Sequence, residues 1–257
     1  MTLIPQGTPV VLVNAFPLDR SQWEPLLAEP ALRDAPIGDI LTFDMPGLGD
    51  MPASQEEPSL ELVADGAVAA MREVTGHTAA LWVGCSMGGY VAMAVAQRHA
   101  DAVAGLVLLG TKATADDAAA RAGRLETAAR MEALEHAPDP AAMAEPLVGT
   151  RGARREELLA DVTRIIARQG GSGIAWGQRA MAARPDRLAV LAGLDVPAAV
   201  VWGTEDAVSS QAASEAMATA LHVPLTVLDG VGHLAAFEAP AQVAPVVADV
   251  AARIPYL

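Results

Sequence analysis

Short apolar runs alternate with amphipathic segments along most of the chain. Short runs of mostly apolar residues predict strands at residues 10–14, 37–43, 79–83, 103–109, 198–202 and 225–228. Between them, apolar residues recur at helical spacing, as in the segments that begin after Ser59, at Gln211 and at Ala241. Because strands and helices alternate, we expect an α/β fold: a mostly parallel central sheet with helices on both faces.

The pattern changes after Thr111. Residues 113–185 contain no convincing strand, and Ala, Arg and Glu recur there at helical spacing between prolines and glycines. We expect about four short helices, inserted into the α/β pattern as a helical cap. The predicted organisation is a single domain over residues 1–257, with a core of 1–112 and 186–257 and a cap of 113–185.

Composition and charge narrow the possible functions. The 257 residues carry a net charge of −14, which argues against nucleic acid or an anionic membrane as a partner. No apolar run is long enough to cross a bilayer, and no export signal is visible. The one cysteine rules out an internal disulfide. We expect a cytoplasmic protein that takes a small-molecule substrate; the oligomeric state stays open.

The segment Gly84-Cys-Ser-Met-Gly88 lies between a predicted strand and a predicted helix. Gly-x-Ser-x-Gly in this position is typical of a nucleophile elbow, which presents a serine hydroxyl above the sheet on a tight, strained turn. The two glycines remove β-carbons where strand and helix approach each other. Ser86 is therefore the predicted nucleophile, and the alternative is a small-residue turn with an inert serine.

A serine hydroxyl needs a base that takes its proton as it attacks. Of the five histidines, His233 lies in a loop between a strand and a helix, where α/β sheets place reactive groups. Asp206 follows the strand at 198–202 and is the predicted partner of this base. The chain order Ser, Asp, His is the one expected for an elbow of this kind. The neighbouring Glu205 remains a rival for the role of Asp206.

The tetrahedral intermediate of acyl transfer needs two backbone donors for its oxyanion. The N–H of Met87, directly after the nucleophile, is the first candidate. The N–H of Phe16, in the loop after the first strand, is the second, because Pro17 has no N–H. The Phe16 ring and Trp176 are tentative substrate-binding residues. This chemistry requires no cofactor and no metal.

Together these residues resemble the α/β-hydrolase superfamily over nearly the whole chain. The resemblance rests on the elbow Gly84-Cys-Ser-Met-Gly-Gly89, Asp206 in a Gly-x-x-Asp turn, Gly232-His233, Trp23 nine residues after Asn14, and the loop Asp44-Met-Pro-Gly-Leu-Gly49. The most similar branch contains small bacterial esterases, 3-oxoadipate enol-lactonase-like hydrolases and cofactor-free haloperoxidases. The chain departs from the family's His-Gly before the oxyanion residue, where it has Asn14-Ala15.

The resemblance implies hydrolysis of a small or medium carboxylic ester, lactone or thioester through an acyl-enzyme on Ser86. One alternative is a perhydrolase, or cofactor-free haloperoxidase, that uses the same three residues. An alternative of another class is a non-catalytic protein that binds a small molecule on the same fold.

Overall fold

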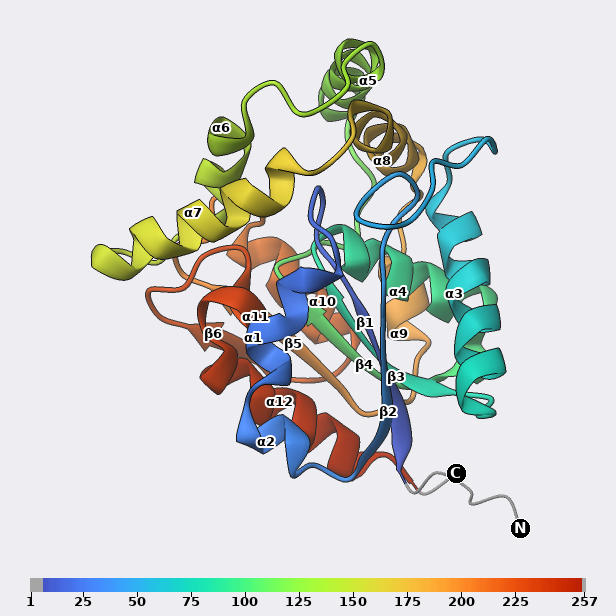
Figure 1. The fold of residues 1–257 in the computed structure, drawn as a ribbon. Helices are drawn as coiled ribbons and strands as arrows, with labels where there is room; N and C mark the ends of the chain where they lie inside the picture. Colours follow the sequence, from blue (N-terminus) through green and yellow to red (C-terminus); the bar gives the residue numbers. More distant parts are fainter. Residues whose placement is uncertain (1–6, 256–257) are drawn as a thin grey trace.

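A six-stranded sheet organises the molecule, and every pair of neighbouring strands in it runs parallel. The computed structural model describes residues 7–255. The strand order is β2-β1-β3-β4-β5-β6 (Figure 1). The strands are β1 (Thr8–Val13), β2 (Ile37–Phe43), β3 (Ala80–Cys85), β4 (Val103–Leu109), β5 (Ala198–Gly203) and β6 (Leu225–Leu228). The α/β fold expected from the sequence is confirmed.

The inner strands are buried on both sides, which explains their continuous apolar runs. Every residue of β1, β3 and β5 is buried, whereas the edge strand β2 is only partly so. The helices that cover one face are α3 (Leu60–Thr75), α4 (Met87–Arg98), α9 (Leu188–Ala192) and α10 (Gln211–Ala220). Those on the other face are α1 (Glu24–Leu27), α2 (Pro30–Arg33), α11 (Ala235–Glu238) and α12 (Pro240–Arg253).

The path of the chain creates a switch point between β1 and β3. From β1 the chain moves outward to β2 and then returns past β1 to β3, which pairs with β1 on its other side. The loops that follow β1 and β3 therefore leave the same edge of the sheet side by side, and such a point is where open α/β sheets bind ligands.

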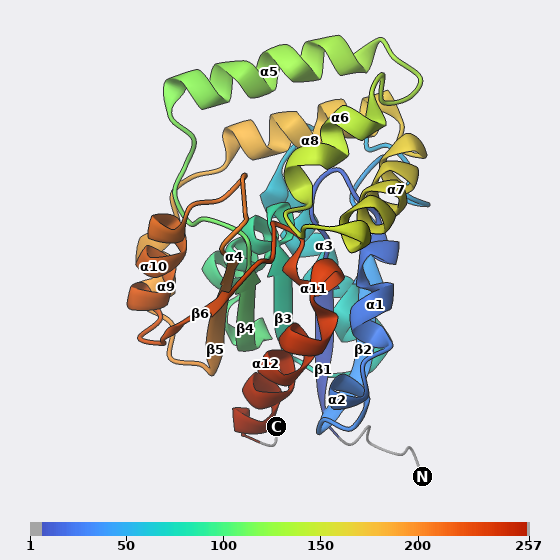
Figure 2. The same cartoon turned by 90° about the vertical axis from the view of Figure 1, so that its left-hand side faces the viewer.

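Between β4 and β5 the chain forms a group of helices above the carboxyl ends of the strands (Figure 2). We call residues 113–185 the insert. Its helices are α5 (Ala118–Glu132), α6 (Pro140–Ala144), the 3-10 turn Glu145–Leu147, α7 (Ala153–Ala167) and α8 (Gly171–Ala183). α5 packs against α8, and α6 packs against α7. An isolated bridge between His136 and Gly170 is the insert's single β-type pairing in the described chain.

The insert contacts the core through glycines in α8. A β-carbon on Gly173 would lie 2.0 Å from the carbonyl oxygen of Gly47, in the loop after β2. A β-carbon on Gly177 would lie 2.7 Å from the ring of Phe16. These two positions let the backbone of α8 approach the core more closely than any larger residue allows.

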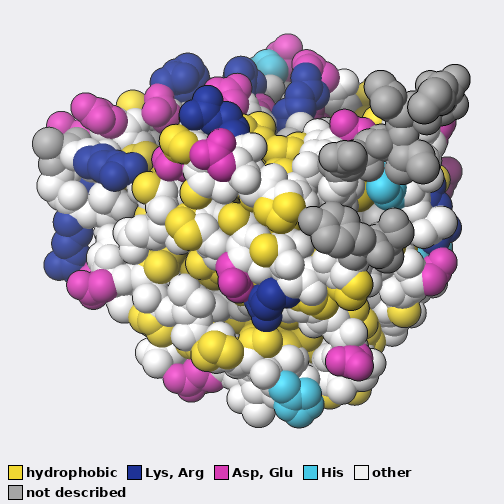
Figure 3. Space-filling view, turned by 90° about the horizontal axis from the view of Figure 1, so that it is seen from below, with side chains coloured by type: hydrophobic (Ala, Val, Ile, Leu, Met, Phe, Trp, Pro, Cys, Tyr) yellow, Lys and Arg dark blue, Asp and Glu magenta, His cyan; other side chains and the backbone are white. Residues whose placement is uncertain are grey.

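The opposite side of the molecule has a mixed surface. On the face away from the insert, basic side chains lie among acidic ones and do not form one continuous patch (Figure 3). Over residues 7–255 no helix combines the length and the apolar character that crossing a membrane requires.

Candidate active site

Ser86 lies at a strained turn between β3 and α4. Its φ of 51° and ψ of −113° fall in a region that residues with a β-carbon rarely adopt. The glycines on either side make the turn possible. A β-carbon on Gly84 would lie 2.4 Å from the carbonyl oxygen of Gly88, and one on Gly88 would lie 1.9 Å from that of Val13. The Gly-x-Ser-x-Gly pattern thus has a steric cause at both glycines.

The end of β4 holds the Ser86 backbone in place. The Ser86 N–H donates to the carbonyl of Leu109 at 2.9 Å. The hydroxyl of Thr111 donates to the Ser86 carbonyl at 2.7 Å. Two residues of the neighbouring segment therefore fix both polar backbone groups of Ser86, and this support is independent of the side chain of Ser86.

Gly110, between these two residues, brings the other predicted site residues to the same place. It has a φ of 52°, and a β-carbon there would lie 3.2 Å from Nδ1 of His233 and 3.3 Å from Oδ2 of Asp206. The sulfur of Cys85 lies 3.9 Å from the carbonyl oxygen of His233. The loops after β3, β4, β5 and β6 thus meet around Ser86.

His233 and Asp206 form a buried pair. Nδ1 of His233 lies 3.0 Å from both carboxylate oxygens of Asp206, and the two side chains are 1% and 0% exposed. Asp206 Oδ1 also accepts the N–H groups of Val208 and Ser209, each at 2.8 Å. Burial alone would raise the pKa of Asp206, but the hydrogen bonds from His233 and Ser209 outweigh it and hold that pKa below its ordinary value. Asp206 is therefore a carboxylate that accepts the Nδ1–H.

The other ring nitrogen of His233 faces no internal partner. With a proton on Nδ1, a neutral imidazole carries its lone pair on Nε2. Among the described residues, the buried Nε2 forms no hydrogen bond, so it is not bonded to the Ser86 hydroxyl in this conformation. Such contacts between a nucleophile and its base are often long until substrate binds. Ser86 itself is partly exposed.

Glu205, the rival carboxylate, points elsewhere. Its Oε2 lies 2.6 Å from Nη2 of Arg151, in the insert, and the pair is at the surface. Of the two adjacent acids, Asp206 is the one that contacts His233.

The loop after β1 holds one candidate oxyanion donor, Phe16, and the elbow after β3 holds the other, Met87. The N–H of Ala15 donates to Oε1 of the buried Gln22 at 2.8 Å. The Asn14 amide spans the turn and donates to the carbonyl of Leu18, which is the role of asparagine at this departure from the family pattern. Within residues 7–255 the N–H groups of Phe16 and Met87 donate to no protein acceptor.

Comparison with known proteins places this chain in a family. The family model described as the alpha/beta hydrolase family matches residues 10–246. The chain belongs to the α/β hydrolase family. No curated protein sequence matches it significantly.

Solved structures of other α/β hydrolases share the fold. An esterase from Thermogutta terrifontis, with malate bound, is 30% identical with a TM-score of 0.84, covering 95% of this chain and 89% of its own. The enol-lactonase of Burkholderia xenovorans LB400 is 25% identical with a TM-score of 0.79, covering 97% and 93%. A bromoperoxidase from Bacillus anthracis, 18% identical with a TM-score of 0.76 and covering 95% and 91%, shows the likeness of the fold alone.

The tryptophans of this α/β hydrolase differ in their hydrogen bonding. The indole N–H of Trp82 donates to the carbonyl of Ala102 at 2.8 Å, and that of Trp202 donates to Ser209 at 3.2 Å. Trp176, in α8, is 5% exposed, and its indole nitrogen has no partner among the described residues. It directly precedes Gly177, which lies against Phe16. Trp176 is thus a buried donor next to the predicted oxyanion loop.

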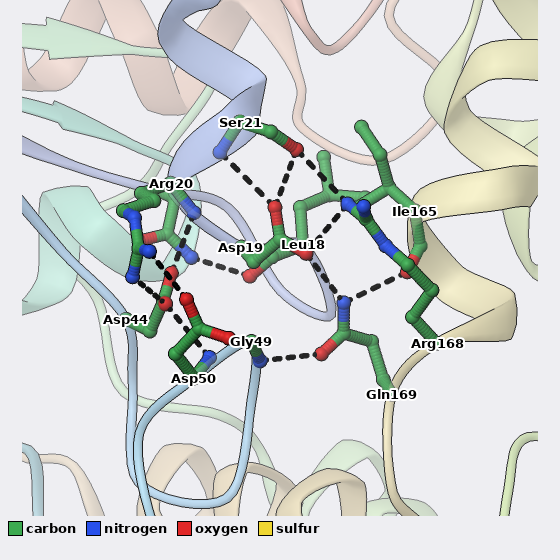
Figure 4. A network of polar contacts seen from close by, with 11 residues as sticks. Leu18, Asp19, Arg20, Ser21, Asp44, Gly49, Asp50, Ile165, Arg168 and Gln169 are labelled. Atoms are coloured by element: carbon green, nitrogen blue, oxygen red, sulfur yellow. Dashed lines mark hydrogen bonds and ion pairs between the residues drawn. The ribbon is translucent and has the colours of Figure 1, made fainter.

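Two surface cavities of this hydrolase have linings that do not include Ser86. One of about 470 Å³ is lined by charged groups that include Asp19, Arg20, Asp44, Asp50 and Arg168 (Figure 4). Its ion pairs join Arg20 to both Asp44 and Asp50. A second, of about 530 Å³, lies between the loop after β2 and α3. Over the described chain, no group of three or more His, Cys, Asp or Glu side chains is placed to hold a metal ion.

Two buried residues of the site were not identified from the sequence. Gln22 orders the oxyanion loop, and Glu238 accepts hydrogen bonds on both sides of His233. Glu238 directly precedes the Ala239-Pro240 start of α12, so in sequence it looks like an ordinary acid at a helix N-terminus. Its distance of five residues from His233 is the one available signal.

Proposed function

We propose that this α/β hydrolase cleaves a small or medium carboxylic ester, lactone or thioester through an acyl-enzyme on Ser86. The observation that carries the proposal is the buried His233–Asp206 pair, whose unpartnered Nε2 lies in the same loop cluster as the strained Ser86. The 30% identity to an esterase and the 25% identity to an enol-lactonase support ester or lactone bonds as the target.

In the proposed mechanism each group of the site has one defined role. Nε2 of His233 accepts the hydroxyl proton of Ser86 as the serine oxygen attacks the carbonyl carbon. The Asp206 carboxylate keeps the proton on Nδ1 and stabilises the imidazolium that forms. The free N–H groups of Phe16 and Met87 donate to the oxyanion. His233 then returns the proton to the leaving group and later activates water, which releases the acid and restores Ser86.

We propose further that the insert, residues 113–185, caps the site of the core, residues 1–112 and 186–257. Support comes from α8, which lies on the Phe16 ring at Gly177. The substrate would then lie between the loop clusters and α8, with Phe16 and Trp176 beside its acyl or leaving group. The unpartnered indole N–H of Trp176 would suit an oxygen of such a substrate.

The test is a substrate panel together with a serine-directed probe. p-Nitrophenyl esters of rising chain length and small lactones are assayed side by side, and a fluorophosphonate probe is added to the folded protein. We expect turnover of at least one class and labelling at Ser86. A folded protein that neither turns over the panel nor takes the label would favour the non-catalytic binding role.

Replacing the nucleophile gives the sharpest prediction. Ser86→Ala should lower kcat on the best ester by about 10⁵-fold or more, because no other group can form the acyl-enzyme. Ser172→Ala makes the same chemical change at an exposed position of α8 and should leave kcat unchanged. Circular dichroism checks that both variants fold. Near-wild-type activity of folded Ser86→Ala would refute the mechanism.

A further inference from the structure

Glu238, the last residue of α11, is a buried carboxylate held by uncharged donors. It is 1% exposed and accepts five hydrogen bonds, four from backbone N–H groups and one from a hydroxyl. A carboxylate is costly to bury unless it is well hydrogen-bonded, so this arrangement depends on all of its donors staying in place. The proposed mechanism does not use Glu238 on any reacting atom.

Two of the five donors lie on either side of the candidate base. The N–H of Gly232 donates to Oε2 of Glu238 at 3.1 Å, and the N–H of Leu234 donates to Oε1 at 3.1 Å. The two oxygens therefore hold the backbone both before and after His233. Asp206 thus fixes the imidazole at Nδ1, and Glu238 fixes the backbone on both sides of His233.

The other three donors belong to the insert, just before α7. Oε2 of Glu238 accepts the N–H of Gly149 at 3.0 Å, and both the N–H and the hydroxyl of Thr150 at 2.8 Å. The two loops touch directly, since a β-carbon on Gly232 would lie 2.1 Å from the nitrogen of Gly149. One oxygen thus binds the insert and the His233 loop together.

We propose that Glu238 is a positioning residue that sets the candidate base and the insert in register with each other. The inference rests on the proposed function, because it gives His233 the role of base. If the insert moves at residues 149–150, Oε2 loses donors and the Gly232 side of the His233 loop is no longer held at the same place. The position of the insert and the alignment of the base are therefore coupled through one carboxylate.

A second buried carboxylate provides a matched comparison at the other end of α7. Asp19 Oδ2 accepts Nη2 of Arg168 and Nε2 of Gln169, both at 2.9 Å (Figure 4). Asp19 is 5% exposed, and its remaining bonds are to Ser21. It fastens the insert without touching the His233 loop.

The variants Glu238→Gln and Asp19→Asn distinguish positioning of His233, which should affect kcat, from fastening of the insert, which should affect KM. In Glu238→Gln the amide N–H₂ replaces one carboxylate oxygen and faces the N–H donors of that oxygen, which repels them. We expect kcat to fall by about 100-fold, which is the cost of misplacing a catalytic group by about 1 Å. In Asp19→Asn only the insert loosens, so KM should rise while kcat stays near that of the unchanged protein. Equal losses of kcat in both variants, or an unchanged kcat in folded Glu238→Gln, would overturn the proposal.

A measurement that needs no turnover keeps the proposal distinct from the proposed function. Thr150→Val removes one insert-side bond and leaves the His233 loop unaltered in sequence. We expect faster amide hydrogen exchange at Gly232 and Leu234 in this variant, because the shared carboxylate loses a donor. Faster exchange confined to residues 149–150 would refute the coupling. This readout decides even if the protein hydrolyses nothing or if Glu238→Gln does not fold.

Discussion

At the scale of single residues, the site depends on which of two adjacent acids faces the imidazole. Asp206 is fixed toward His233 by the N–H groups of Val208 and Ser209, whereas Glu205 is drawn to the surface by Arg151. The short aspartate side chain turns back onto its own loop, and the longer glutamate reaches outward. The two positions therefore offer a matched pair of isosteric amide substitutions.

Asp206→Asn should lower kcat by roughly 1,000-fold or more, because an asparagine no longer holds the proton on Nδ1. Glu205→Gln loses only a surface ion pair, which contributes about 0–1 kcal/mol, and should leave kcat close to that of the unchanged protein. Steady-state kinetics on the same ester compares them. The assignment would be wrong if Glu205→Gln were the more damaging change.

Cys85 is next to Ser86 yet is chemically inert in this structure. It is fully buried, and burial raises the pKa of its thiol to about 12, with the nearby charges of Asp206 and Glu238 adding to the effect. At pH 8 it stays a thiol, so iodoacetamide should not modify the folded protein and should modify it fully in denaturant. Mass spectrometry of the two reactions checks this. Rapid alkylation of the folded protein would instead indicate an accessible thiolate.

At the scale of elements, the two connections between core and insert are joined by one ion pair. Asp116, just before α5, binds Arg184, just after α8, with two bonds of 2.7 and 2.8 Å, and both side chains are almost fully buried. Arg124 and Lys112 also bind this carboxylate, and the Arg184 guanidinium lies 4.1 Å from the centre of the Tyr90 ring. The insert is thereby locked at its base.

This lock should make stability depend on pH in the acid range. Burial alone would raise the pKa of Asp116, but hydrogen bonds from Arg184, Arg124 and Lys112 outweigh it and hold that pKa well below its ordinary value. Because the folded-state pKa is the lower one, the stability that Asp116 contributes is complete above the unfolded value of about 3.9. It is lost progressively as pH falls from that value through the folded-state pKa.

Asp116→Asn should therefore lower the free energy of unfolding by about 3–5 kcal/mol at pH 7, since it leaves a buried guanidinium without its partner. The difference between the two proteins should begin to shrink as pH falls from 5 to 3, because the Asp116 carboxylate then takes up a proton in the unfolded chain while it stays charged in the folded protein. Urea unfolding at several pH values measures it. A difference that stays constant down to pH 3 would contradict the role of this carboxylate.

At the scale of the whole molecule, the features that follow from local pattern were predictable and those that follow from distant contact were not. Buried parallel strands leave mostly apolar runs in the sequence. Both ends of every predicted strand therefore lie within two residues of the ends of an observed strand. The elbow is likewise local, because the clash that requires Gly84 involves Gly88, four residues away. The short helices α9 and α11 were not predicted, since five or four residues carry too little periodicity.

The unpredicted part of the site joins segments far apart in sequence. Glu238 binds Thr150 across 88 residues, and nothing in either neighbourhood indicates the other. The choice between Asp206 and Glu205 depended on Arg151, which is 54 residues from Glu205. Likewise, the sequence could not show that the indole N–H of Trp176, unlike those of Trp82 and Trp202, lacks a partner among the described residues.

The close contact of α8 with the core at Gly173 and Gly177 limits which inserts this hydrolase can accept from its relatives. A chimera that takes its insert from another member must bring glycine at positions 173 and 177, and the host core must keep Gly47. The backbone of Gly47 faces Gly173 and the Phe16 ring faces Gly177, and both leave too little room for a β-carbon. If the transferred helices lacked these glycines, α8 would be displaced from the Phe16 ring. Under the proposed capping role, an exchange of inserts that aims to change the substrate must therefore transfer these contact points together with the lining side chains.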